Sequence, residues 1–227
     1  IYLERTPETE AVLEKFLASS TPYQYKYSAE ERERFLEICL LVGRSHYIPV
    51  AELAEQLTVS YGTIAADLEL VEKWFAEHNL TLVKKSRMGL QVLGDEIQIQ
   101  KTCLRRLGEN ITLAEYDRYL CKKPLDSKIT LAILNELFYG LDIDFFRDLP
   151  KHAESVLNRI FSDESFGNLI FFLALLTQRH ISGVAGPIRV PNHDDTLSLT
   201  NEHEAASMLL DILSKKFSIS FSPGDCW

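Results

Sequence analysis

A three-residue link, Thr58 to Ser60, separates two stretches of helical pattern and constrains the fold more than any other feature of the sequence. The stretch before it, Val50 to Leu57, predicts a short amphipathic helix. After it, Ser60 is suited to cap a longer helix, whose apolar stripe recurs at helical spacing in Ile64, Leu68, Val71 and Phe75. Two helices joined by so short a link, with an apolar residue to fill the bend, are typical of a helix-turn-helix unit.

The segments on either side extend this unit to a winged helix. Upstream, "YSAEERERFLEICLLVG" predicts a helix that Ser28 and Glu31 cap and Gly43 ends. Downstream, "LTLVKKSRMGLQVLGDE" alternates, turns at Ser86 to Gly89 and alternates again, which predicts a hairpin. Three helices followed by a hairpin are the order of elements in a winged helix, which we place at residues 28–97.

The rest of the 227-residue chain is helical in pattern. From Asp95 onward, amphipathic stretches follow one another with few interruptions, and we predict an all-α bundle for residues 98–227 that closes with a short strand at Ser218 to Phe221. Residues 1–27 predict a linker helix and the tail of an upstream domain. The fold class expected is therefore mostly α, with a winged helix-turn-helix domain followed by a helical bundle.

Several classes of protein are disfavoured. The chain has no apolar run long enough to cross a bilayer, and its start at Ile1, without a signal pattern, predicts a cytoplasmic protein represented by an internal piece. Its four cysteines have no metal-binding spacing. His193 and His203, with their acidic neighbours, would need a folded-back loop to bind a metal, so we expect no metal and no cofactor. Phosphate-binding and nucleophile motifs are missing, and we expect no enzyme.

Two groups of residues are candidates for contacting DNA. At the start of the helix after the link, Ser60 and Thr63 can donate hydrogen bonds to phosphate, Tyr61 can reach a base edge, and Gly62 lies beside them. At the hairpin turn, a wing would present three cations to the phosphates: Lys84, Lys85 and Arg87.

The charge of the chain opposes this assignment. The net charge is -9, and from Ser28 to Asp95 the carboxylates outnumber Lys and Arg by four. We expect Asp67 and Glu69 to face or flank the surface of the candidate residues, where they would repel phosphate. DNA contact would then need a dimer, the basic wing or an upstream domain. The alternative is a protein-protein interaction or dimerisation module whose winged helix no longer reads DNA.

The winged-helix residues resemble a known family. The pattern resembles the second helix-turn-helix unit of bacterial transcriptional activators with phosphotransferase-system regulation domains (PRDs), the mannitol-operon activator type; it comprises Leu53, Ala54, Leu57, Val59, Ser60, Thr63, Ile64, Asp67, Leu68, Gly89, Val92, Gly94, Asp95 and Glu96. Downstream, "FSDESFGNLIFFLALLTQRHISG" and "NEHEAASMLLDILSKKFSISFSP" resemble helices of the first regulation domain. The resemblance extends over residues 28–225.

This resemblance implies a regulator of carbohydrate operons that binds operator DNA as a homodimer and is phosphorylated on histidines by phosphotransferase-system proteins. The chain departs from the family where phosphorylation would occur: Phe172 replaces the first acceptor histidine, whereas Arg179, seven residues later, is kept. The second histidine would fall just beyond Asp225. His152, with Arg159 at the same offset, gives a competing alignment for a phosphorylation site.

Overall fold

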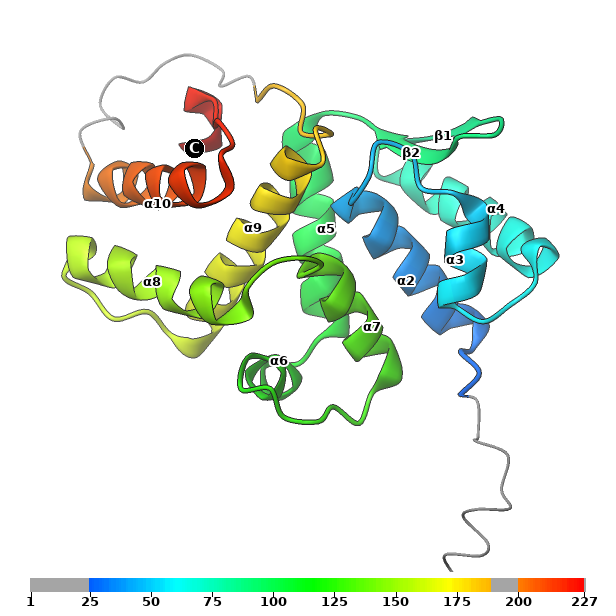
Figure 1. Cartoon of the computed structure of the whole chain (residues 1–227), viewed down its shortest axis with the longest axis horizontal. Helices are drawn as coiled ribbons and strands as arrows, with labels where there is room; N and C mark the ends of the chain where they lie inside the picture. The colour runs from blue at the N-terminus through cyan, green and yellow to red at the C-terminus, as the bar shows by residue number, and fades with distance from the viewer. Residues whose placement is uncertain (1–24, 189–199, 227) are drawn as a thin grey trace, which may run out of the picture.

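The computed structural model describes residues 25–188 and 200–226 (Figure 1). The winged helix consists of α2 (Ala29–Val42), α3 (Val50–Gln56), α4 (Tyr61–Glu77), β1 (Thr81–Lys85) and β2 (Gly89–Leu93). The helical half that follows consists of α5 (Glu96–Asn110), α6 (Leu113–Leu120), α7 (Lys128–Leu137), α8 (Ile143–Leu157), α9 (Asp163–Ile181), α10 (Asn201–Phe217) and a 3-10 turn (Pro223–Cys226). The predicted fold class is confirmed.

The helix starts follow from side-chain caps that the sequence carries. The hydroxyl of Ser28 accepts a hydrogen bond from the N–H of Glu31, whose carboxylate accepts one in return from the N–H of Ser28. Gly43 then ends α2 in the left-handed region. Ser60 caps α4 by accepting from the N–H of Thr63. Each cap satisfies a backbone donor that the helix itself leaves open, so α2 and α4 begin at the predicted residues.

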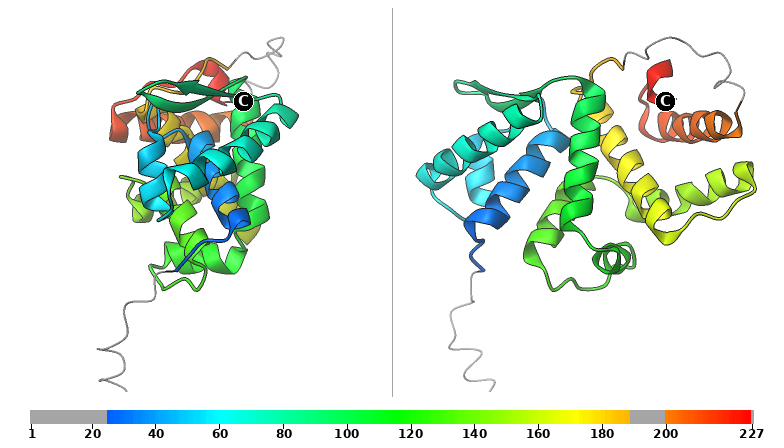
Figure 2. Two further views of the ribbon diagram at one scale, coloured as in Figure 1. Left: turned by 90° about the vertical axis from the view of Figure 1, so that its right-hand side faces the viewer. Right: turned by 180° about the vertical axis from the view of Figure 1, so that it is seen from behind.

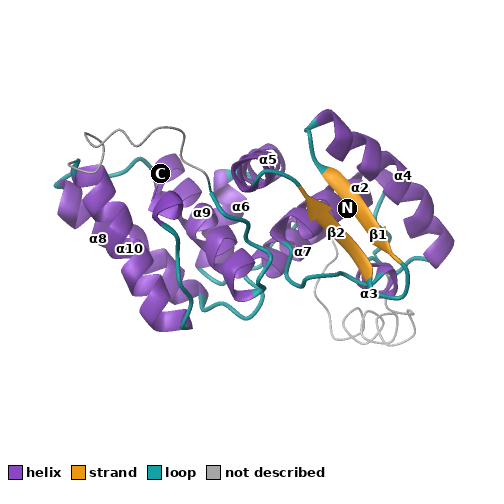
Figure 3. Cartoon of the chain, turned by 90° about the horizontal axis from the view of Figure 1, so that it is seen from above, coloured by secondary structure: helices purple, strands orange, loops and turns teal. Residues whose placement is uncertain are grey.

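The wing is a two-stranded antiparallel hairpin tied to the helices by one further backbone pairing (Figure 3). Its register pairs Thr81 with Leu93 at one end and Lys85 with Gly89 at the other. Ile48, in the connection between α2 and α3, exchanges backbone hydrogen bonds with Leu90. This close approach requires glycine at position 89, because a Cβ there would lie 2.3 Å from the carbonyl oxygen of Ile48 and φ is +125°.

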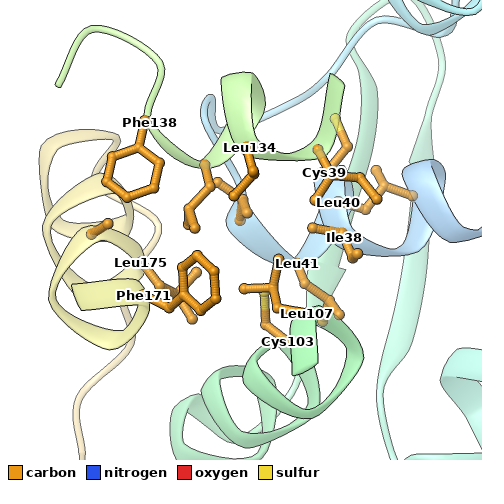
Figure 4. Close-up of a cluster of buried hydrophobic side chains, with 14 of the residues drawn as sticks. Ile38, Cys39, Leu40, Leu41, Cys103, Leu107, Leu134, Phe138, Phe171 and Leu175 are labelled. Atoms are coloured by element: carbon orange, nitrogen blue, oxygen red, sulfur yellow. The ribbon is translucent and has the colours of Figure 1, made fainter. Parts of the chain in front are cut away.

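Helix α2 connects the winged helix to the helical half. Every residue from Phe35 to Val42 is buried, because α4 packs on one side of α2 and α5 and α7 pack on the other (Figures 1 and 2). Figure 4 shows the resulting shared core, in which Ile38 and Leu41 of α2 lie with Leu107 of α5 and Leu134 of α7. The domain limits at residues 27 and 97 stay a prediction; residue 97 lies in the first turn of α5, which itself packs against α2 and α9.

The segment after α10, where we expected a strand, is a turn and a loop that lead into the 3-10 turn. Helix α10 packs mainly against α8, with the ring of Phe217 against those of Phe145 and Phe146. The predicted strand at Ser218 to Phe221 is wrong: Ser218 adopts a left-handed conformation, and the only sheet in the described residues is the wing, which offers this segment no strand to pair with. The predicted N-terminal linker helix and the loop around His193 fall outside the described residues.

Candidate nucleic-acid interface

The start of α4 and the wing line one open groove of about 580 Å³. Tyr61 and Ala65 contribute from α4, and the segment Lys84 to Leu90 contributes from the wing. Tyr61 is 66% exposed and Met88 is 45% exposed, so large side chains of both elements project into solvent at this groove. Of the DNA-contact candidates, Tyr61 and the three wing cations line this groove, whereas Ser60, Gly62 and Thr63 are not among its lining residues.

The hydroxyls of Ser60 and Thr63 lie at the start of α4, on either side of Tyr61 and Gly62 in the chain. Ser60 Oγ lies 3.1 Å from the backbone nitrogen of Thr63 and 2.9 Å from its hydroxyl. Gly62, between them, is exposed. The first turn of a helix keeps further N–H groups without an intrahelical partner, and its dipole favours an anion there. The start of α4 is therefore chemically suited to a phosphate.

The three wing cations are exposed but differ in their surroundings. Lys84 Nζ lies 2.5 Å from the carboxylate of Glu72 on α4. Lys85 Nζ lies 5.2 Å from the centre of the Tyr47 ring. Arg87 occupies the hairpin turn with a φ of +64°. An exposed ion pair such as Lys84 with Glu72 contributes little stability, so these side chains can exchange their present partners for phosphates.

Asp67 does not face this surface, and the prediction that it does is wrong. It is 5% exposed, because its position beside Leu68 and three residues after Ile64 places it on the buried stripe of α4. Arg32 of α2 neutralises it through two hydrogen bonds of 2.7 and 3.0 Å. Glu69 is exposed, as expected. One of the two carboxylates that we expected to repel phosphate is therefore removed from the groove.

The candidate regulatory residues lie in the helical half and do not line the groove. Phe172 is half-buried on α9 and lines an apolar cavity of about 170 Å³ between α8, α9 and α10. His152 is exposed on α8. Arg179 is buried and faces the winged helix: its Nε and Nη2 lie 2.6 and 2.7 Å from the carboxylate oxygens of Glu96. The Arg179 Nη1 group also donates to the backbone carbonyl of Leu41 in α2 at 2.6 Å.

Sequence reasoning missed a second polar contact between the halves. Arg44, after α2, pairs with Glu52 of α3 and, at 3.0 Å, with Glu136 of α7. Burial raises the pKa of Glu136 and outweighs the opposing effect of Arg44. The Arg44 guanidinium also lies 4.2 Å from the centre of the Tyr139 ring. Partners so distant in sequence give no local signal, so only the fold reveals this contact.

Within residues 25–188 and 200–226, no group of three or more His, Cys, Asp or Glu side chains is placed to hold a metal ion. In the same residues no helix is both long enough and apolar enough to cross a membrane. Of the histidines that we considered as metal ligands, only His203 belongs to the described part of the chain.

Comparisons with known proteins agree with the helix-turn-helix assignment. Residues 7–105 match the model of the Mga helix-turn-helix domain. The transcriptional regulator ManR of Bacillus subtilis (strain 168) is 26% identical over 150 residues, which are 66% of this chain and 21% of ManR. The probable licABCH operon regulator of the same organism is 25% identical over 204 residues, 85% of this chain and 28% of that protein. The chain thus spans less than a third of either relative.

Proposed function

We propose that the chain is a member of the family of bacterial transcriptional regulators that it resembles in sequence, and that it binds operator DNA of carbohydrate operons through the groove between α4 and the wing. The observation that carries this proposal is that Tyr61, in the first turn of α4, lines one open groove together with Lys84, Lys85 and Arg87 of the wing. The burial of Asp67 against Arg32 removes a carboxylate that would oppose it.

The proposal includes a regulatory role for the helical half. By its resemblance to a regulation domain, this half would control dimerisation and respond to phosphotransferase-system proteins. Helix α2 supports such coupling, because it packs against α4 and against α5 and α7. A rearrangement of the helical half would therefore move an element that also holds the DNA-contacting helix. Because Phe172 has no atom that accepts a phosphoryl group, a response to phosphorylation would have to use another residue, such as His152.

A salt titration of DNA binding tests the proposal. The full chain would be titrated with the DNA upstream of its own reading frame, and compared with the variant in which Lys84, Lys85 and Arg87 are all alanine. If the wing contacts phosphates, the plot of log affinity against log salt becomes shallower by about 2 to 3, since each phosphate contact contributes about 0.9 to the slope. The matched control replaces three exposed cations of the helical half, Lys123, Lys128 and Lys215, and should leave the slope unchanged.

A second candidate function is a protein-docking or dimerisation module. It is favoured by the outer face of α4, where Tyr61 and the 49% exposed Leu70 are apolar and Glu69 is acidic. No binding to promoter DNA at low salt, with the flanking parts of the protein restored, would contradict the DNA-binding proposal. Loss of self-association or of partner binding in a Leu70→Ser variant would then support this module.

A further inference from the structure

The outer face of α4 has an unusual composition for a helix that enters the major groove. Its exposed residues from Tyr61 to Leu70 are apolar or small apart from Glu69; the others are Tyr61, Gly62, Ala65, Ala66 and Leu70. The first cation on the helix is Lys73, about two turns beyond Ala66. The face is therefore smooth, and the methyl groups of two adjacent alanines form its centre.

This composition restricts which base edges the helix can read. Guanine presents two acceptors in the major groove and is read by Arg or Lys, whereas adenine is read by Asn or Gln through paired hydrogen bonds. None of these residue types lies on the face before Lys73. Glu69 only accepts hydrogen bonds when ionised, so it cannot bond to the acceptors of guanine, and its partner in the major groove would be an amino group such as that of cytosine. Thymine alone presents a methyl group, and apolar side chains such as alanine contact it.

The wing would also favour DNA that is rich in A·T pairs. Arg87 lies at the exposed hairpin turn in the groove that the α4 face also lines. A-tracts narrow the minor groove and strengthen its negative potential, which attracts an inserted Arg. A site rich in A·T pairs therefore suits both the apolar helix face and the basic wing.

Resting on the proposed DNA binding, we propose that α4 reads its site through thymine methyl groups, which contact Ala65, Ala66 and the neighbouring apolar side chains. The small residues let the helix backbone approach the bases closely, and the wing cations provide the attraction to phosphate that the helix itself lacks. Specificity then depends on the pattern of methyl groups and not on hydrogen bonds to guanine.

Base analogues test this inference. Duplexes that bind the full chain would be selected from a random-sequence pool, and the preferred sequence would be remade with deoxyuridine in place of thymidine, which removes only the methyl groups. Affinity should fall about 4-fold for each buried methyl group, so about 15-fold for two. The matched probe replaces guanine by 7-deazaguanine, which removes the N7 acceptor, and should change affinity by less than about 2-fold.

A helix variant links the effect to α4. Replacing Ala65 and Ala66 by serine keeps small side chains on the helix but adds polar hydroxyls, and circular dichroism would verify that the variant is folded. The variant should bind thymine-containing DNA more weakly and lose most of its sensitivity to deoxyuridine. If the affinity for the selected DNA is unchanged by deoxyuridine but falls with 7-deazaguanine, the inference about thymine methyl groups is wrong, whereas the proposed DNA binding stands. A pool that yields no bound sequence would overturn the proposed function as well, and would favour protein docking.

Discussion

Arg179 and Glu96 form a buried two-point ion pair between α9 and the first turn of α5, with both side chains no more than 3% exposed. Glu96 also accepts hydrogen bonds from Gln100 and from the N–H of Gly186, and Arg179 donates to the carbonyl of Leu41. Arg179, which the family resemblance marks as regulatory, thus holds α9 against α5, the helix that follows the wing. Through its bond to the carbonyl of Leu41 in α2, Arg179 also connects the helical half to the winged helix.

We expect removal of one partner of this pair to be costly. Arg179→Met should lower the free energy of unfolding by about 3 to 5 kcal/mol, because it leaves the Glu96 carboxylate buried without a counter-charge. Arg179→Lys keeps the charge but cannot form both bonds, so its loss should be smaller. Urea unfolding measures both. If Arg179→Met combined with Glu96→Gln is no more stable than Arg179→Met alone, the buried charge is not the cause.

Asp67 and Glu69 lie two residues apart on α4 and should behave in opposite ways. Asp67→Asn should cost about 3 kcal/mol of stability, because Arg32 loses its buried counter-charge. Glu69→Gln should leave stability nearly unchanged and raise DNA affinity about 2- to 5-fold at low salt, as expected for one exposed charge pair. Chemical denaturation and DNA titration separate the two effects. A gain in affinity for folded Asp67→Asn as large as for Glu69→Gln would contradict the placement of Asp67.

The wing depends on glycine at one position. Gly89→Ala should destabilise the chain by about 2 to 3 kcal/mol, since the new Cβ meets the backbone of Ile48 in a conformation that costs an L-residue energy. Gly108→Ala is the matched control: its Cβ meets nothing within 4 Å, and alanine in the last turn of α5 should add at most about 0.5 to 1 kcal/mol. Thermal unfolding measures both, and equal effects of the two substitutions would argue against the Ile48 contact.

The sequence predicted the elements well because their signals are local. Ser28, Ser60 and Gly43 are caps whose partners lie within four residues, and the stripe of α4 needs only helical periodicity. The wing turn likewise follows from alternation around Ser86 to Gly89. These features account for most of the fold that positions the groove.

The ion pairs between residues far apart in sequence could not be predicted in the same way. Asp67 looked exposed because a carboxylate is rarely buried without a partner, and its partner Arg32 lies 35 residues upstream. Glu96 is 83 residues from Arg179. Nothing local marks either pairing. The charge count over Ser28 to Asp95 had the same weakness. It treated every charged residue as facing solvent, although some of them neutralise one another inside the protein.

His180 and Asp225 form a further long-range contact, between α9 and the C-terminal 3-10 turn. The His180 Nε2 lies 3.5 Å from the Asp225 carboxylate, and the imidazole ring packs 4.6 Å from the centre of the Phe221 ring. Burial alone would lower the pKa of His180, but the bonds to Asp225 and to the Leu176 carbonyl outweigh it, and the pKa is raised. For Asp225, burial acts upward, and its bonds to His180 and Ser222 outweigh it and lower the pKa.

These directions define a pH dependence of stability. Because the folded pKa of His180 lies above the unfolded value of about 6.5, its contribution is complete below pH 6.5 and is lost as pH rises through the folded pKa. The contribution of Asp225 to stability is complete above its unfolded pKa. It is lost only as pH falls through the lowered folded pKa. The parent chain should therefore lose stability between about pH 6.5 and 8, and His180→Gln should make this loss smaller. Urea unfolding at the two pH values measures the free energy of unfolding of both chains. Asp225→Asn should have the same effect through the other partner. An unchanged loss in both variants would show that the pair does not control stability in this range.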